Sequence, residues 1–230
     1  MARRLALYLG VLLTCAPFAA TAAKADSSEG VRRPPSLLTV DTGPNMLGTA
    51  TTIIRADRFT GSWANAMQDA SGSPMLLRLV APARQLTPGQ KLAYVQSRVH
   101  SSIRWISDAT QWGKHDYWAT AAQTLARGAG DMEDRAIVKM HALRALGFNP
   151  KDLFLTLARD RVGGPITVLT ARLNGRYFIL DDTGGTPFPV DNRRNEFDPI
   201  LSFGWNGAWV HKRLAPPTTM AAVKKPIGRK

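Results

Sequence analysis

Cysteine is almost absent from this chain, which holds one cysteine among 230 residues. That residue, Cys15, lies inside an apolar run near the N-terminus. If the run is removed as a signal peptide, the mature chain has no thiol, which excludes disulfides, sulfur ligation of metals and a cysteine nucleophile. An alternative is lipidation, because Leu12-Leu13-Thr14-Cys15 loosely resembles a lipobox.

Long apolar runs are lacking outside the N-terminus. Arg3 and Arg4 precede an apolar stretch over residues 5–18, and small residues follow as far as Ala25. This pattern predicts a signal peptide over residues 1–25, cleaved near Ala23 to Ala25. No later stretch has the length and apolar character of a membrane span. We therefore expect a periplasmic or secreted protein with no transmembrane segment in its mature form.

Acidic residues are few, with 17 Asp and Glu against 30 Lys and Arg and a formal charge of +13. Removal of Arg3, Arg4 and Lys24 leaves 27 basic and 17 acidic residues, a charge of +10. Such a surface attracts anionic partners, and export makes nucleic acid the least fitting of them. An anionic envelope surface is therefore one candidate partner. A generally basic, soluble surface explains the charge equally well.

The pattern along the chain predicts one domain over residues 45–212, between a flexible leader at 26–44 and a basic, disordered tail at 213–230. Helical signals precede strand signals, and Asn174-Gly175 is typical of a β-hairpin turn. This order indicates an α+β fold, with N-terminal helices packed on a C-terminal antiparallel sheet. Helices are expected at residues 60–69, 90–105, 119–127 and 131–146, and strands at 153–158, 167–173 and 177–180.

The helix expected at residues 131–146 begins directly after the glycine-rich break Gly128-Ala129-Gly130. The first turn of a buried helix suits a cysteine nucleophile, because the free N–H groups and the helix dipole lower the pKa of a thiol. An ordinary core helix is the alternative interpretation. Its buried face is then formed by Met132, Ala136, Met140 and Leu143.

The segment at residues 116–136, DYWATAAQTLARGAGDMEDRA, resembles the bacterial transglutaminase-like cysteine proteinases, which include the LapG-type periplasmic proteases that release surface adhesins. That family carries D-Y-W-A-T and G-D-C-E-D, then a strand that opens with H-A-V-L, and then L-D-N. The resemblance covers residues 45–212 in consistent order and implies a papain/transglutaminase-like fold. The corresponding segments here are residues 116–120, 128–134, 166–169 and 180–182.

Two of the three catalytic positions implied by the resemblance have lost their chemistry. Met132 stands at the nucleophile and Ile166 at the histidine, while Asp181 retains the orienting acid. A thioether has no proton to lose, and isoleucine neither accepts nor donates one. We therefore expect an inactive homologue in which Met132 and Ile166 pack together and fill the site. The alternative is an active peptidase or acyl transferase with a rebuilt, non-cysteine site; Thr167 lies near the lost histidine, but no adequate base for it is evident.

The acidic residues beside Met132 have two interpretations. In the adhesin-releasing relatives the residues at the positions of Asp131 and Glu133 contribute to a calcium site, and clustered carboxylates suit that ion. Alternatively, Asp131 caps the helix, and Glu133 and Asp134 are favoured in its first turn by the dipole. The two interpretations are compatible.

Aromatic residues beside this helix are candidates for a partner groove. Tyr117 and Trp118 could contact a partner, although a buried tryptophan supporting the helix fits equally well, and Trp205 and Trp209 are expected to cover a sheet edge. The leading hypothesis is an exported pseudoprotease that binds a protein, either an adhesin or a regulator of adhesin release, with a role in biofilm formation. A basic envelope-binding protein is the remaining alternative.

Overall fold

An antiparallel sheet forms one layer of the computed structural model, which describes residues 43–55, 59–190 and 196–214. Its seven strands follow the order β1-β9-β8-β4-β5-β6-β7. The strands are β1 (Thr49–Ile54), β4 (Leu153–Asp160), β5 (Pro165–Leu173), β6 (Arg176–Leu180), β7 (Phe188–Pro189), β8 (Phe197–Gly204) and β9 (Gly207–Arg213). The predicted signal peptide, the predicted leader as far as residue 42 and the predicted tail from residue 215 lie outside the described residues.

The hairpin between β5 and β6 forms where the sequence predicts it. Asn174 and Gly175 both have positive φ, 52° and 77°. A two-residue turn of this kind matches the right-handed twist of the flanking strands, and Asn-Gly tolerates it best. The turn fixes the register, which places Leu169 opposite Leu180.

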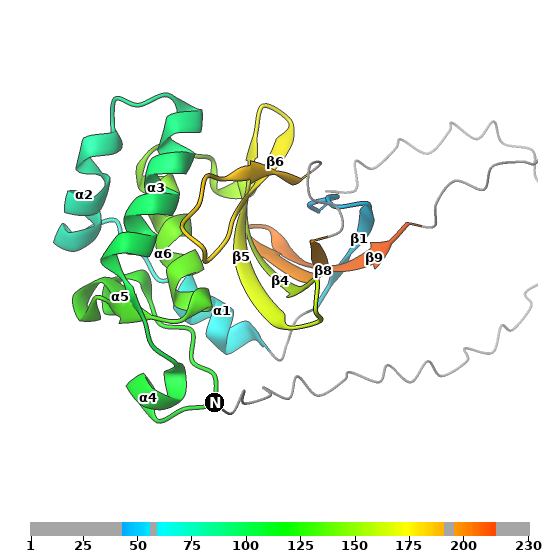
Figure 1. The fold of residues 1–230 in the computed structure, drawn as a ribbon, viewed down its shortest axis with the longest axis horizontal. Helices are drawn as coiled ribbons and strands as arrows, with labels where there is room; N and C mark the ends of the chain where they lie inside the picture. The colour runs from blue at the N-terminus through cyan, green and yellow to red at the C-terminus, as the bar shows by residue number, and fades with distance from the viewer. Residues whose placement is uncertain (1–42, 56–58, 191–195, 215–230) are drawn as a thin grey trace, which may run out of the picture. The chain divides into compact units, whose positions relative to one another are not determined.

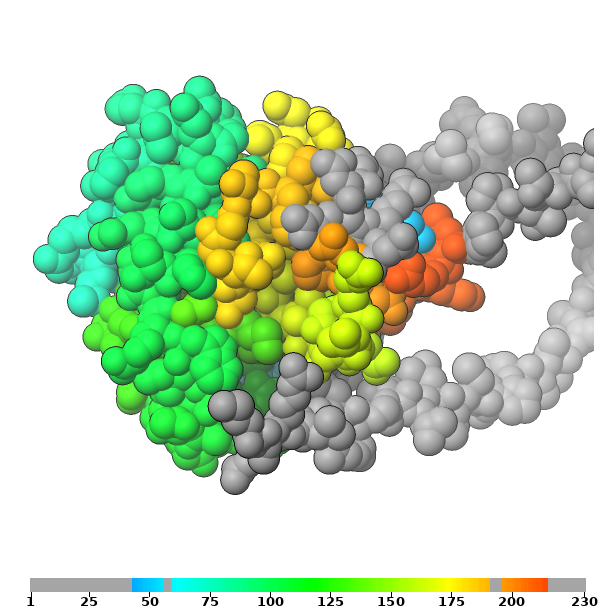
Figure 2. All heavy atoms as spheres, in the orientation of Figure 1, coloured from blue at the N-terminus to red at the C-terminus, as the bar shows by residue number. Residues whose placement is uncertain are grey.

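Helices cover one face of this sheet (Figure 1). The helix α6 packs against β4, β5, α3 and α5, so it lies between the sheet and the outer helices. Space-filling atoms show the helices and strands as neighbouring layers (Figure 2). The helices are α1 (Thr60–Ala66), α2 (Pro74–Val80), α3 (Pro88–Ser102), α4 (Asp108–Trp112), α5 (Ala121–Arg127) and α6 (Met132–Ala145).

The helix expected over residues 90–105 ends earlier, because its last residues pair with another segment. Arg104–Trp105 form the short strand β2, parallel to β3 (Ala129–Gly130). The Arg104 N–H donates to the Gly128 carbonyl at 2.9 Å. This tertiary pairing outweighs the local helical pattern, and it brings β2 beside the start of α6.

Apolar residues gather on both faces of the sheet. The larger cluster lies between sheet and helices, and the smaller one contains Met46, Leu47, Val168, Ile179 and Val190. The segment before β1 passes close over Trp209, since a Cβ on Gly43 would lie 2.3 Å from the indole. Trp209 is thus buried on a sheet face, whereas Trp205 is exposed at the β8–β9 turn with the Arg144 guanidinium 4.9 Å from its ring centroid.

None of the helices in the described ranges is long and apolar enough to cross a membrane.

Candidate functional site

The start of α6 is built around a close backbone approach. A Cβ on Gly130 would lie 2.6 Å from Cβ and 2.8 Å from Oδ2 of Asp134, so a side chain there would displace the carboxylate. Asp131 caps the helix, its Oδ1 accepting from the Asp134 N–H at 3.3 Å. Gly130 and the cap together place two carboxylates on one side of the helix start.

A third carboxylate, from Asp108 at the start of α4, completes what we call the acid cluster: Asp108, Asp131 and Asp134. One oxygen from each residue lies within 4.8 Å of the others. Asp108 accepts from the Tyr117 N–H at 2.6 Å, and Asp134 accepts from the Ala119 N–H at 2.8 Å. The second oxygens, Asp108 Oδ1 and Asp134 Oδ2, are buried with no hydrogen-bond partner.

Burial raises the pKa of every member of the acid cluster, and nearby carboxylates raise it further. Burial is the largest cause, and neighbouring carboxylates add to it, which raises the pKa of Asp131 to about 9 and that of Asp134 to about 7. The pKa of Asp108 is raised for the same first reason. A divalent cation removes both penalties, and oxygen ligands of this kind suit calcium. The two unpartnered buried oxygens therefore fit a hard cation.

The predicted calcium ligands divide between two roles. Asp131 belongs to the acid cluster, but Glu133 does not, because its Oε1 accepts from the Thr167 hydroxyl at 2.6 Å. Sequence reasoning missed Asp108, which only the fold brings to Asp131. No local pattern in the sequence links Asp108 to Asp131, because the two residues are 23 positions apart.

The position predicted for the lost histidine faces away from α6. β5 pairs with β4 without a register shift, so its side chains alternate between the two faces. Thr167 contacts Glu133 on the α6 side, whereas Ile166 packs with the smaller apolar cluster that contains Val168. Met132 is half-buried and belongs to neither apolar cluster. The expectation that Met132 and Ile166 pack together is therefore wrong, because alternate strand residues occupy opposite faces.

The Thr167 hydroxyl does have a basic neighbour, contrary to expectation. Glu133 supplies a carboxylate, and burial raises the pKa of that group. However, Thr167 is 3% exposed. A polypeptide carbonyl has little access to a hydroxyl buried to this extent.

The retained acid, Asp181, is held by groups other than an imidazole. Its Oδ1 accepts from Gln96 Nε2 at 3.0 Å and from the Thr183 N–H and hydroxyl at 3.0 and 2.7 Å. The Lys139 ammonium donates to its backbone carbonyl. These donors fix Asp181 in a local turn, without the base that it would orient in a catalytic triad.

A salt bridge lies directly beside Asp181. Arg135 Nη1 lies 2.7 Å from Asp182 Oδ1, and this arginine side chain is 7% exposed. The same guanidinium donates to the Ile103 carbonyl. The Oδ1 atoms of Asp181 and Asp182 thus both have donors from the chain itself.

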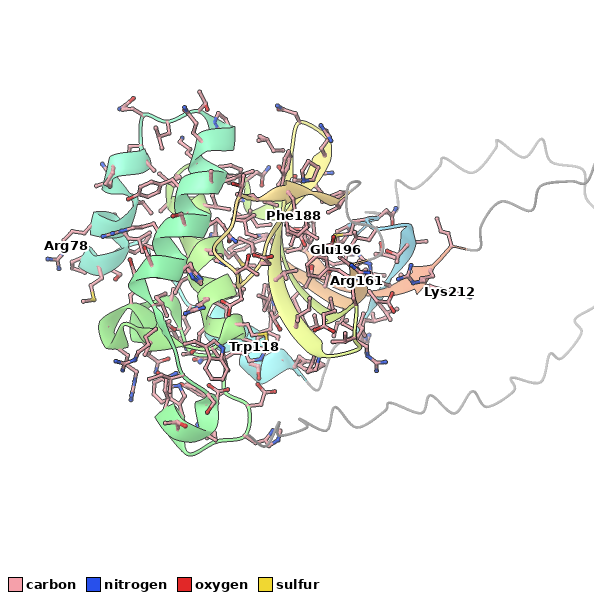
Figure 3. The ribbon with its side chains drawn as sticks, in the orientation of Figure 1. Arg78, Trp118, Arg161, Phe188, Glu196 and Lys212 are labelled. Carbon is pink, nitrogen blue, oxygen red and sulfur yellow. The ribbon has the colours of Figure 1, made fainter. Side chains whose placement is uncertain are left out.

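The two aromatic candidates for a partner groove, of which Figure 3 labels Trp118, differ in exposure. Trp118 is 2% exposed and packs on Phe59 and Phe203, with ring centroids 5.9 and 5.4 Å away. It therefore supports the core, which is the second of the two interpretations offered for it. Tyr117 is half-buried, and its ring centroid lies 4.8 Å from that of Trp112.

Comparisons with known proteins agree with this arrangement. The family model described as bacterial transglutaminase-like cysteine proteinase BTLCP matches residues 79–197. Calcium-bound Legionella pneumophila LapG is 24% identical with a TM-score of 0.52, covering 59% of this chain and 75% of that one. A second LapG structure from Legionella pneumophila is 22% identical at the same TM-score, covering 69% and 88%. No curated protein matches the chain. The likeness to LapG confirms the expected fold of helices on an antiparallel sheet.

Proposed function

Because this chain belongs to the bacterial transglutaminase-like cysteine proteinase family, we propose that it is an exported, catalytically inactive member that binds calcium and a protein partner. Inactivity follows from the chemistry at three positions. Met132 has no ionisable proton, neither Ile166 nor the α6-facing Thr167 has a basic atom, and Asp181 has no imidazole to orient.

The observation that carries this proposal is the set of donors around Asp181. In a cysteine or serine relay the acid holds the base in the correct tautomer and stabilises its charged form. Here Gln96 and Thr183 occupy the accepting oxygen. The retained aspartate therefore supports a structural turn rather than proton transfer.

Calcium is proposed at the acid cluster. Asp108, Asp131 and Asp134 would hold the ion, whose charge would stabilise three ionised carboxylates in a buried site. Two similar structures, LapG in calcium-bound and EGTA-treated form, support the choice of this ion. The two unpartnered carboxylate oxygens support it from this chain alone.

A protein is the proposed partner, because the fold of a peptidase is retained without its chemistry. The resemblance to LapG-type proteases favours an adhesin or a regulator of adhesin release. The inactive protein would then shield the cleavage site of an adhesin, or bind a regulator of adhesin release, without cleaving either.

A rebuilt hydrolase is the second candidate, favoured by the 2.6 Å contact between Thr167 and Glu133. One assay separates it from the first. The purified chain is incubated with adhesin polypeptide, with and without calcium, and products are identified by mass spectrometry. We expect no cleavage, and an Asp181→Asn variant should behave identically. Cleavage that is lost in a Thr167→Ala variant would overturn the inactive assignment and identify the nucleophile.

A further inference from the structure

Four side chains form a continuous stack at the end of the helical layer near α4. The Arg127 guanidinium lies 3.9 Å from the Trp112 ring centroid, and the Trp112 and Tyr117 ring centroids are 4.8 Å apart. Lys114 Nζ lies 4.1 Å from the Tyr117 centroid. We call Arg127, Trp112, Tyr117 and Lys114 the aromatic–basic ladder. Its two cations are exposed at either end.

The ladder is held in place by the residues that follow it. The Tyr117 N–H donates to Asp108 at 2.6 Å, and the Ala119 N–H donates to Asp134 at 2.8 Å. Tyr117 also exchanges hydrogen bonds with Gln123 of α5. Side chains fixed in this way lose little conformational entropy when a partner binds.

An open strand edge lies next to the ladder. The Arg104 N–H points toward β3, where it meets the carbonyl of Gly128, the neighbour of Arg127. In a parallel pair the next residue, Trp105, directs its backbone N–H and C=O to the opposite side. Within the described ranges no strand pairs with that side of β2. Both β2 side chains are exposed, Trp105 by 53%.

We propose that β2 and the aromatic–basic ladder together form a docking surface for an extended, acidic segment of a protein partner. The segment pairs its backbone with Trp105 and directs its carboxylates to Arg104, Lys114 and Arg127. This inference rests on the proposed function, in that it specifies the partner that the inactive protein binds.

Charge and backbone geometry select this occupant over others. Three exposed cations surround the edge, and Asp116 is the exposed acid on the same loop, since Asp108 faces inward. Aromatic and arginine side chains are the residue types that dominate protein interfaces. An extended polypeptide can match an open backbone edge with its own regularly spaced N–H and C=O groups, which a lipid or polysaccharide lacks.

Matched variants test the surface with a synthetic peptide as the probe. The probe is a fluorescein-labelled peptide of alternating Glu and Val, and its control has Lys in place of Glu. Binding to the full chain is followed by fluorescence anisotropy. Arg104→Glu and Trp105→Ala alter the surface. Both side chains are exposed, so the variants should keep the fold, which circular dichroism checks.

Two exposed residues far from the surface serve as controls. Trp205, 51% exposed, has Arg144 over its ring near the C-terminal end of α6, about 20 Å along the helix from Asp131. Arg176 is an exposed arginine at the hairpin end of β6. The control variants are Trp205→Ala and Arg176→Glu.

The expected result is binding of the Glu peptide and not of the Lys peptide. Arg104→Glu should weaken it by about tenfold or more and Trp105→Ala by about fivefold, with the control variants within about twofold. Equal loss in test and control variants, or binding only to anionic phosphatidylglycerol vesicles, would overturn the proposal. This outcome is independent of the cleavage assay. Cleavage of the adhesin polypeptide would refute inactivity but not the docking surface. Failure of the peptide to bind would refute the docking surface but not inactivity.

Discussion

Two groups of aspartates lie near α6, and they are satisfied in opposite ways. Asp181 and Asp182 receive donors and cations from the chain itself, through Gln96, Lys139 and Arg135. Among the residues that the structure describes, the acid cluster at the helix start receives backbone N–H groups but no cationic side chain. Two of its buried oxygens have no partner.

On the proposed function, this difference separates metal binding, at the acid cluster, from the structural role of Asp181 and Asp182. On that proposal, the region around Asp181 is a self-contained structural element, whereas the acid cluster would be completed by a cation. A buried carboxylate oxygen without a partner is costly, and the proposed cation would remove that cost. The variants below test whether Asp182 acts through stability alone and whether the acid cluster alone responds to calcium.

The largest effect is expected from Asp182→Ala. It leaves the buried Arg135 guanidinium without its carboxylate, which should lower the free energy of unfolding by about 3–5 kcal/mol. Urea denaturation measures the loss. The double variant Arg135→Met/Asp182→Ala should recover a good part of it, because no unpaired charge remains. A single-variant loss below about 1 kcal/mol would show that the salt bridge is not what satisfies this region.

Calcium should stabilise the chain by an amount that grows with pH. Without a cation, Asp131 and Asp134 bind protons more tightly when folded than when unfolded, so stability falls as pH rises from about 4 through their pKa values of about 7 and about 9. Calcium at about 100 times its Kd adds about 2.7 kcal/mol, or roughly 5–10 °C in Tm. At one fixed calcium concentration, scanning calorimetry at pH 5 and pH 8 should give the larger increase in Tm at pH 8. An equal increase at both, or one that persists in Asp134→Asn, would contradict the acid cluster as the site.

A smaller effect is expected from Lys139→Met. Burial lowers the pKa of Lys139 to about 8, so the unfolded chain binds this proton more tightly, and stability from this group rises as pH increases from about 8 to about 10.5. At pH 7 the variant should lie within about 1.5 kcal/mol of the parent, because an apolar isostere avoids the burial of a charge. Urea denaturation at pH 7 and pH 10 should favour the parent more at pH 10. A constant difference would show that Lys139 stays charged in the fold.

The smallest effect is expected from Asp181→Asn. The amide oxygen still accepts from Gln96 and Thr183, so stability should change by less than about 1 kcal/mol. Thermal denaturation, with and without calcium, measures it. A change in the calcium-dependent part of Tm would link the two groups of aspartates that the structure keeps apart.

Local signals explain what the sequence predicted of the fold. Asp131 caps α6 and the glycine-rich break precedes it, so the helix is visible from neighbouring residues alone. Asn174-Gly175 specifies its hairpin in the same way. The placing of Met132 at the nucleophile and Asp181 at the orienting acid came from a family resemblance, which requires no knowledge of contacts between distant residues.

The features that sequence reasoning missed depend on contacts between distant segments. Asp108 joins Asp131 only because β2 pairs with β3. The orientation of Ile166 depends on which face of β5 packs against α6, and a one-residue difference in position reverses that face. The helical spacing of apolar residues up to Trp105 gave no sign of β2, because its pairing partner, β3, lies after α5 in the sequence.

The most direct test of the account is isothermal titration of calcium into the purified chain and two variants. We predict one calcium ion per wild-type chain, unchanged binding in Asp181→Asn, and affinity reduced by about a hundredfold or more in Asp108→Asn/Asp134→Asn, which removes two ligand charges. Binding that survives the double variant, or that is lost in Asp181→Asn, would contradict the account.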